Sequence, residues 1–261
     1  MSAANSLTCR VCADQARFLW RAAPLGHQVG YFECGSCGYI QTEQPFWLDE
    51  AYASPINLTD TGILGRNKDC MERVLITLWL LKARQGRVID LAGGFGILVR
   101  MLRDAGVDAR WSDKYAQNLV AKGFEDDGGH AVLATSFESF EHFIDPVQEM
   151  SAMLSRADSL LISTQLAPVP TPPPSAWWYY GLEHGQHIGF FRRQTLEYLA
   201  SRLNVRVLSD GESFHLFTRS SLSEYFWLQA LKRRKRCFKW ARRGLASLTW
   251  SDHEALKLRQ I

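Results

Sequence analysis

The sequence lacks the features that mark a secreted or membrane-spanning protein. Its first ten residues, MSAANSLTCR, contain neither the basic stretch nor the apolar stretch of a signal peptide. The longest apolar stretch, from Val74 to Leu81, is far shorter than the roughly 20 residues that a membrane helix needs. We therefore expect a cytoplasmic protein, a compartment in which cysteines stay reduced.

The sequence also lacks a strong net charge, with 30 Lys and Arg against 27 Asp and Glu. An even spread of such charges would argue against a nucleic-acid binder, but residues 232–261 hold ten Lys and Arg and only two acids. From about Ser223 the tail interleaves aromatic and basic residues. This pattern is typical of a basic amphipathic helix on an anionic membrane or an acidic partner. A helix packed on the protein's own acidic body explains residues 222–261 equally well.

Six cysteines in a reduced compartment need an explanation other than disulfides. Four of them form two pairs, Cys9-x-x-Cys12 and Cys34-x-x-Cys37, a spacing typical of a zinc ribbon. Each turn aims two thiolates at one point, so the pairs complete a tetrahedral shell that leaves no open position. We therefore expect a structural Zn²⁺ in a ribbon over residues 1–44. Two redox pairs or a coincidence are the alternatives, and the isolated Cys70 and Cys237 are interpreted as unliganded thiols.

A glycine-rich turn follows a short apolar strand at residues 87–91. Three glycines of this turn, at positions 93, 94 and 96, precede apolar residues at helical spacing. Strand, glycine loop and helix together begin a doubly wound α/β domain, whose helix N-terminus offers unpaired N–H groups to a ligand. A second strand, Val107 to Ser112, ends at Asp113, an acid placed to accept hydrogen bonds from ribose hydroxyls.

Asp90, the acid at the end of the first strand, distinguishes this turn from a dinucleotide-binding loop. A carboxylate there repels a pyrophosphate but suits a cationic sulfonium. The segment resembles motif I of class I S-adenosylmethionine (SAM)-dependent methyltransferases, D/E-x-G-x-G-x-G, with alanine in place of the first glycine. The resemblance implies a SAM site that includes Asp90, Ala92, Gly93, Gly94, Gly96, Asp113 and Lys114.

A second resemblance to the same superfamily covers residues 136–146. Ser-Phe-Glu-Ser-Phe-Glu-His and a later Asp-Pro are similar to its fourth-strand segment E-x-x-E-H…D-P. This implies cofactor contacts of Phe137 and Glu138 and a structural or peripheral His142. The implied fold is α/β, a doubly wound seven-stranded Rossmann-like sheet whose third strand is reduced to Lys122–Glu125.

Over roughly residues 9 to 218 the chain resembles bacterial methyltransferases that carry an N-terminal zinc ribbon and act on sugars or other small metabolites. With the basic tail, we therefore expect four parts: a ribbon over 1–44, a helical cap over 45–85, a SAM domain over 86–220 with a substrate loop at 165–192, and a helical tail over 221–261. The resemblance also implies methyl transfer to a sugar or sugar nucleotide of a surface-polysaccharide or secondary-metabolite pathway. No nucleic-acid partner is expected, because no Asn/Asp-Pro-Pro-aromatic signature of base methylation occurs.

Two residues of the cap are candidates for the methionine end of SAM. In such enzymes the segment before motif I commonly caps the cofactor pocket, so Tyr52 would contact the ligand and Arg66 would pair with its carboxylate. A core tyrosine and a solvated arginine are the alternative interpretations.

The substrate loop carries the candidate catalytic residues. Five prolines stiffen it, and Trp177, Trp178, Tyr179 and Tyr180 would offer flat walls to a sugar. His184 or His187 is the candidate base that removes the acceptor's proton, with Glu183 orienting or tuning it. A local hydrogen bond is the alternative role for each histidine.

Two other functions remain open at this point. An NAD-dependent sugar-modifying enzyme would use the same kind of fold, although a full GxGxxG loop is missing. A non-catalytic methyltransferase-like scaffold would bind a partner through the ribbon and the basic tail.

Overall fold

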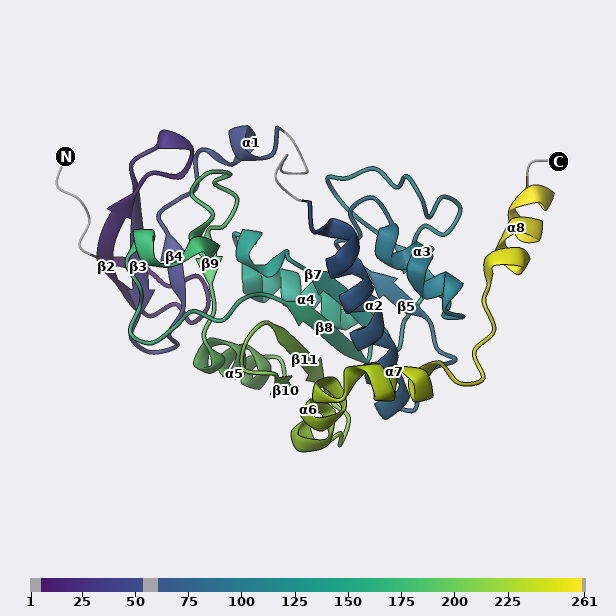
Figure 1. Cartoon of the computed structure of the whole chain (residues 1–261). Helices are drawn as coiled ribbons and strands as arrows, with labels where there is room; N and C mark the ends of the chain where they lie inside the picture. The colour runs from purple at the N-terminus through teal and green to yellow at the C-terminus, as the bar shows by residue number, and fades with distance from the viewer. Residues whose placement is uncertain (1–5, 54–60, 260–261) are drawn as a thin grey trace. The chain divides into compact units, whose positions relative to one another are not determined.

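The computed structural model describes residues 6–53 and 61–259, and residues 54–60 of the expected cap lie outside them. Within these residues the chain forms two compact units that alternate along the sequence (Figure 1). Unit 1 comprises Met1–Asn57, Glu138–Ala152 and Ile162–Phe217, and unit 2 comprises Leu58–Phe137, Met153–Leu161 and Thr218–Ile261.

Unit 1 contains an antiparallel sheet in the order β1-β2-β3-β4-β9. Its strands are β1 Ser6–Thr8, β2 Gln15–Ala22, β3 Val29–Cys34, β4 Ile40–Thr42 and β9 Gly189–Phe190. Four of them form the expected N-terminal ribbon. The fifth comes from the predicted substrate loop, since Ile40 pairs with Phe190 across β4 and β9. A long-range pairing therefore makes the end of the loop part of the ribbon sheet.

A second sheet has the strand order β10-β11-β8-β7-β5-β6. Its strands are β5 Val88–Asp90, β6 Ala109–Trp111, β7 Leu133–Phe137, β8 Ser159–Ser163, β10 Arg206–Ser209 and β11 Phe214–Thr218. In unit 2, β5 runs parallel to both β6 and β7. The reduced third strand is a single parallel bridge between Trp111 and Glu125, so the expected doubly wound α/β fold is confirmed with six strands and this bridge.

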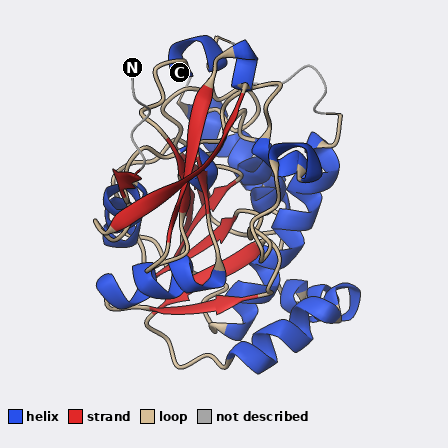
Figure 2. Cartoon of the chain, turned by 90° about the vertical axis from the view of Figure 1, so that its left-hand side faces the viewer, coloured by secondary structure: helices blue, strands red, loops and turns tan. Residues whose placement is uncertain are grey.

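Helices are found in the expected cap, directly after the glycine turn and in the tail, and also between the later strands. Figure 2 distinguishes them from the strands, and their bounds are α1 Leu48–Ala51, α2 Ile63–Leu80, α3 Ile97–Asp104, α4 Pro146–Arg156, α5 Arg193–Arg202, α6 Glu224–Lys232, α7 Arg234–Arg242 and α8 Thr249–Leu258. Short 3-10 helices are η1 Pro24–Gly26, η2 Phe140–His142, η3 Pro174–Ala176 and η4 Trp178–Tyr180. Among the helices of the described ranges, none is long and apolar enough to cross a membrane.

The aromatic residues of the predicted substrate loop form a core rather than exposed walls. Trp177, Tyr179 and Tyr180 are buried in a cluster of unit 1 that also contains Tyr31 and Ile40 of the ribbon sheet. Only Trp178 of the four is exposed, at 76%. The expectation of aromatic walls is therefore wrong for three of the four residues, because the hydrophobic effect favours their burial against β3 and β4.

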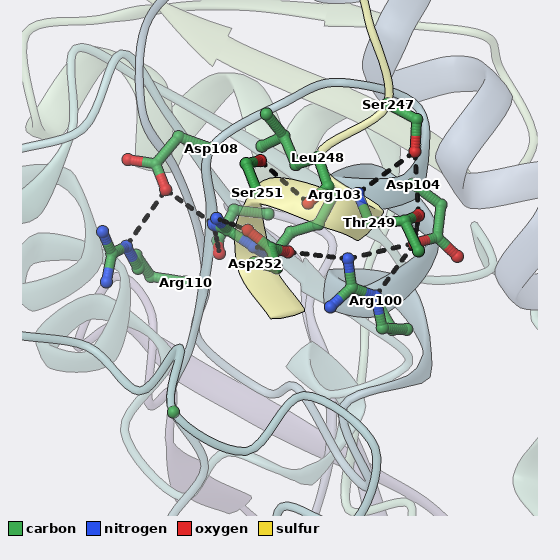
Figure 3. A network of polar contacts seen from close by, with 12 residues as sticks. Arg100, Arg103, Asp104, Asp108, Arg110, Ser247, Leu248, Thr249, Ser251 and Asp252 are labelled. Carbon is green, nitrogen blue, oxygen red and sulfur yellow. Dashed lines mark hydrogen bonds and ion pairs between the residues drawn. The ribbon is translucent and has the colours of Figure 1, made fainter. Parts of the chain in front are cut away.

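The basic tail is three helices, and several of its side chains pack on unit 2. The buried Trp227 donates its indole N–H to Thr77 of α2 at 3.1 Å, and Arg234 pairs with Asp69 and Glu72 of the same helix. Asp252 of α8 is buried beside α3 (Figure 3). This part of the tail packs on the protein's own body.

Asp252 is the centre of the network shown in Figure 3. Its two carboxylate oxygens accept bonds from Arg103 at 2.7 and 2.8 Å, and Arg100 adds a third bond at 2.7 Å. The guanidinium of Arg103 also reaches Asp108 and lies 3.8 Å from the ring centroid of Phe124. Desolvation by burial opposes the charged form of Asp252, but the two arginines outweigh it and hold its pKa below the usual value. The network attaches α8 to α3.

Candidate functional site

The glycine turn of unit 2 joins the end of β5 to the start of α3. Gly96 adopts φ +85°, and a Cβ there would lie 2.6 Å from the side-chain oxygen of Asn118. Gly93 leaves room for the indole of Trp111, which a Cβ would approach to 2.5 Å. The indole N–H of Trp111 in turn donates to the carbonyl of Gly94 at 2.9 Å. Only glycine meets these demands without collision or backbone strain.

Asp113 fastens the same turn from the end of β6. One of its carboxylate oxygens accepts the N–H of Gly94 at 2.9 Å, and the other accepts the N–H groups of Tyr115 and Ala116, both at 2.7 Å. A carboxylate offers about four lone-pair positions, so these bonds leave capacity for a ribose hydroxyl. Lys114 beside it is exposed, with its ammonium 5.2 Å from the ring of Tyr115.

Asp90, at the end of β5, is the buried acid of the turn. Its side chain accepts the Thr135 hydroxyl at 2.7 Å. Burial raises the pKa of Asp90 to about 7, the negative charge of Asp113 adds to the rise, and the Thr135 hydrogen bond opposes it. A cation placed against this carboxylate would favour its charged form and restore an ordinary pKa.

The loop at residues 118–125 of unit 2 is ordered by Asn118 and Glu125. The amide of Asn118 donates to one oxygen of Glu125 at 2.8 Å, and the N–H of Gly123 donates to the other at 2.9 Å. Sequence reasoning missed Trp111, Asn118 and Thr135, because no motif marks them. For Trp111, its place within the predicted strand Val107–Ser112, next to Asp113, is the signal that would have singled it out.

The other candidate cofactor residues are found in both units. Arg66 is exposed in the first turns of α2 in unit 2, and Phe137 ends β7 there. In unit 1, Tyr52 follows α1 and its ring centroid lies 6.1 Å from that of His142. Glu138, also in unit 1, adopts φ +50°, and its N–H donates to the Ser163 hydroxyl at 2.9 Å. A positive φ in a non-glycine residue is strained and is found preferentially at functional sites.

The histidines of the predicted substrate loop gather with the Glu141–His142 pair in unit 1. The ring of His187 lies 4.7 Å from that of His184 and 5.1 Å from that of His142, centroid to centroid. Ligand atoms of Glu141, His142 and His187 lie within 4.8 Å of one another. Glu183 is exposed, so its side chain is not part of the buried cluster, whereas Glu141, which sequence reasoning did not select, is.

The two loop histidines have different hydrogen bonds. Nδ1 of His187 lies 2.6 Å from the carbonyl oxygen of Tyr179, so it carries a proton and Nε2 keeps its lone pair. Nδ1 of His184 accepts the N–H of Gln186 at 3.2 Å. Burial lowers the pKa of both rings, and for His187 the neighbouring His142 adds to the effect. Both are therefore neutral near pH 7.

The four cysteines of the ribbon converge in unit 1. Their sulfur atoms lie within 4.8 Å of one another, with Cys9 and Cys37 at 3.6 Å and Cys12 and Cys34 at 3.4 Å. The hydrogen bond from the Cys37 thiol lowers the pKa of Cys9, while burial raises the pKa of Cys12 and the bond to Cys9 raises that of Cys37. Four convergent sulfur donors fit a tetrahedral Zn²⁺ whose shell is complete without water or substrate.

The chain is similar to known methyltransferases. A family model described as a methyltransferase domain matches residues 65–210, which is more than half of the chain. The comparison with curated proteins finds no significant match.

Among solved structures, the chain is similar to magnesium protoporphyrin IX methyltransferase from Synechocystis with bound SAH, at 18% identity and a TM-score of 0.43 over 65% of this chain and 90% of that one. It is also similar to human N-acetylserotonin methyltransferase in complex with SAM, at 16% identity and a TM-score of 0.43 over 59% and 52%. CalO1, a methyltransferase in calicheamicin biosynthesis, matches at 16% identity and a TM-score of 0.39 over 57% and 55%. These scores lie below 0.5, so the family assignment rests on the match to residues 65–210.

Proposed function

The chain belongs to the methyltransferase domain family, and from this premise we propose that it transfers a methyl group from SAM to a sugar or sugar nucleotide. It is a SAM-dependent methyltransferase, and the small-molecule sugar acceptor is the proposed part. The observation that supports the cofactor assignment is the hydrogen bond from the Gly94 N–H to Asp113, because it joins the glycine turn to the acid that we propose binds the ribose.

We place SAM against the residues that the family motif selects in unit 2. Asp90 faces the cationic end, the N–H groups at the start of α3 bind the carboxylate, and Asp113 with Lys114 binds the ribose side. Tyr52, Arg66, Phe137 and Glu138 remain candidate contacts of the same ligand. Four thiolates from Cys9, Cys12, Cys34 and Cys37 would hold a structural Zn²⁺ in the ribbon.

Methyl transfer is an in-line displacement at a sulfonium, so the protein has to position the acceptor and remove a proton from it. We propose that His184 or His187 is the group through which that proton leaves, with Glu183 tuning the pair. Support comes from the tautomer of His187, whose Nε2 keeps a lone pair.

A direct assay tests this function. The protein is incubated with isotopically labelled SAM and a panel of nucleotide-linked deoxysugars, and products are read by mass spectrometry. We expect labelled methyl in at least one sugar and formation of S-adenosylhomocysteine. Methylation of none of the sugars, alongside intact SAM binding, would reject the sugar acceptor but not the cofactor.

The tail supports a separate, weaker proposal of peripheral contact with an anionic membrane. Lys232, Lys235 and Lys239 are exposed on α6 and α7, and Trp240 is 51% exposed. Deleting residues 222–261 would remove the buried Trp227, so the better test is the double variant K235E/K239E, which changes only surface charge. Pelleting with phosphatidylserine vesicles should fall in this variant at low salt, whereas equal pelleting would remove the membrane contact.

A further inference from the structure

A buried carboxylate in unit 1 has no hydrogen-bond partner of ordinary geometry. Glu141, in the short helix η2, is 0% exposed, and neither of its carboxylate oxygens makes such a bond among the described residues. Burying an uncompensated charge costs roughly several kcal/mol. The Tyr179 and Thr164 side chains lie near this carboxyl, and the charge of Glu138 adds to the cost of its burial. A second charge of the opposite sign is the usual remedy for such a group.

Two imidazoles face this carboxylate. Nε2 of His187 lies 4.0 Å from an oxygen of Glu141, and a ring nitrogen of His142 completes a set of three ligand atoms within 4.8 Å of one another. The three residues come from two segments more than 40 positions apart, which the backbone bond from the Ile188 N–H to the Glu141 carbonyl, at 2.8 Å, holds together.

His187 also has the outer hydrogen bond that metal-binding histidines carry. Its Nδ1 proton goes to the carbonyl oxygen of Tyr179 at 2.6 Å. Such a bond fixes the tautomer and turns Nε2 toward the ion. The Tyr179 ring lies 4.7 Å from the His187 ring, centroid to centroid, and restricts its rotation.

We propose that Glu141, His142 and His187 bind a divalent transition-metal cation such as Zn²⁺, at a site separate from the four-cysteine cluster. Two imidazoles and one carboxylate are a donor set that suits Zn²⁺, Fe²⁺ or Mn²⁺. Metal–ligand bonds of about 2.0–2.2 Å place ligands roughly 3 to 3.5 Å apart, so the three groups close by about 1 Å around the ion.

The site has the character of a catalytic rather than a structural metal site. Three protein ligands leave a fourth position open, whereas the cysteine cluster supplies four ligands and leaves none. The catalytic consequence rests on the proposed function: the open position takes an oxygen of the acceptor and lowers the pKa of its hydroxyl. With the cation in place Nε2 of His187 would be its ligand, so the proposed proton-accepting role would fall to His184, whose ring lies 4.7 Å from that of His187, centroid to centroid.

Metal stoichiometry tests the proposal without any assay of turnover. The full chain is purified with zinc in its cysteine cluster, dialysed, and titrated with Zn²⁺ by calorimetry, with total zinc read by plasma mass spectrometry. We expect two zinc ions per wild-type chain and one in Glu141→Gln, which keeps shape and burial but loses the charged ligand. His142→Ala is the second variant and should also bind one ion. The matched control is His130→Ala, which should still bind two ions because His130 is exposed and pairs with Asp158.

The same samples are titrated with SAM, so failure of the metal site and failure of the cofactor site are distinguishable. Unchanged SAM affinity and an unchanged near-ultraviolet circular dichroism spectrum in Glu141→Gln show that the variant is folded. If Glu141→Gln does not fold, His142→Ala decides by the same measurement. One zinc per wild-type chain, or two in the folded variants, would overturn the proposal.

Discussion

The glycine turn of unit 2 and the histidine cluster of unit 1 are built in different ways. The turn consists of consecutive residues, and its contacts are mostly backbone groups, as in the bond from the Gly94 N–H to Asp113. The cluster consists of side chains from two distant segments, with Glu141 and His142 from one and His187 from the other. A site formed by backbone groups is marked in the sequence by glycines. A site formed by side chains from distant segments has no local sequence pattern.

The largest expected effect is at the turn. We expect Gly96→Val to abolish measurable SAM binding, because the position has φ +85° and a Cβ would lie 2.6 Å from Asn118. Gly128→Val is the matched control: Gly128 has φ +84° with nothing within 4 Å, so it carries the backbone strain without the collision. Calorimetric titration with SAM measures both. Normal binding by Gly96→Val would show that the turn is not the cofactor site.

The next largest effect is at the cluster. We expect His187→Ala to lower turnover by about 10²–10⁴-fold, while SAM affinity changes little because His187 is not among the proposed contacts of SAM. His184→Ala should lower turnover as well, and exposed His27 offers the control His27→Ala. The readouts are kcat on the methylated acceptor and the calorimetric Kd for SAM. Full turnover in both His184→Ala and His187→Ala would remove the proposed proton-transfer role.

This contrast also explains which parts of the molecule were predictable. Strand, turn and helix around residues 87–104 follow from local periodicity and the glycines, and the family and the doubly wound fold are confirmed. The aromatic walls are wrong because Trp177, Tyr179 and Tyr180 pack on the ribbon sheet, a contact that depends on the pairing of β4 with β9. His142 was interpreted as structural or peripheral because it lies in the superfamily motif after the fourth strand, and nothing in the local sequence shows that the distant His187 packs beside it.

A smaller effect is expected at the ion pair that joins α8 to α3, the helix that begins at the glycine turn. α3 begins at the turn, and the buried pair of Arg103 with Asp252 attaches α8 to it. We expect Asp252→Asn to lower the free energy of unfolding by about 3 kcal/mol, because it leaves the buried Arg103 with one carboxylate partner, Asp108, instead of two. Glu197→Gln, which removes an exposed i,i+4 pair with Arg193, should cost under about 0.5 kcal/mol. Urea unfolding measures both, and equal values would show that the network does not stabilise the fold.

The smallest expected effect is the release of protons from Asp90 when SAM binds. Because burial raises its pKa to about 7, the carboxyl is roughly half protonated at pH 7, and a bound cation lowers that pKa. We expect SAM binding at pH 7 to release about half a proton through this group. Calorimetry in phosphate and in Tris detects it as a difference in binding enthalpy, and the difference should disappear in Asp90→Asn. The same difference in wild type and variant would assign the proton to another group.

The central claim is that the acidic glycine turn selects a sulfonium cofactor over a dinucleotide. The most direct measurement is a calorimetric titration of the full chain with SAM and, under identical conditions, with NAD. We predict saturable binding of one SAM per chain, no binding of NAD, and loss of the SAM signal in Asp113→Ala. Binding of NAD in preference to SAM, or unchanged SAM binding in Asp113→Ala, would contradict the account.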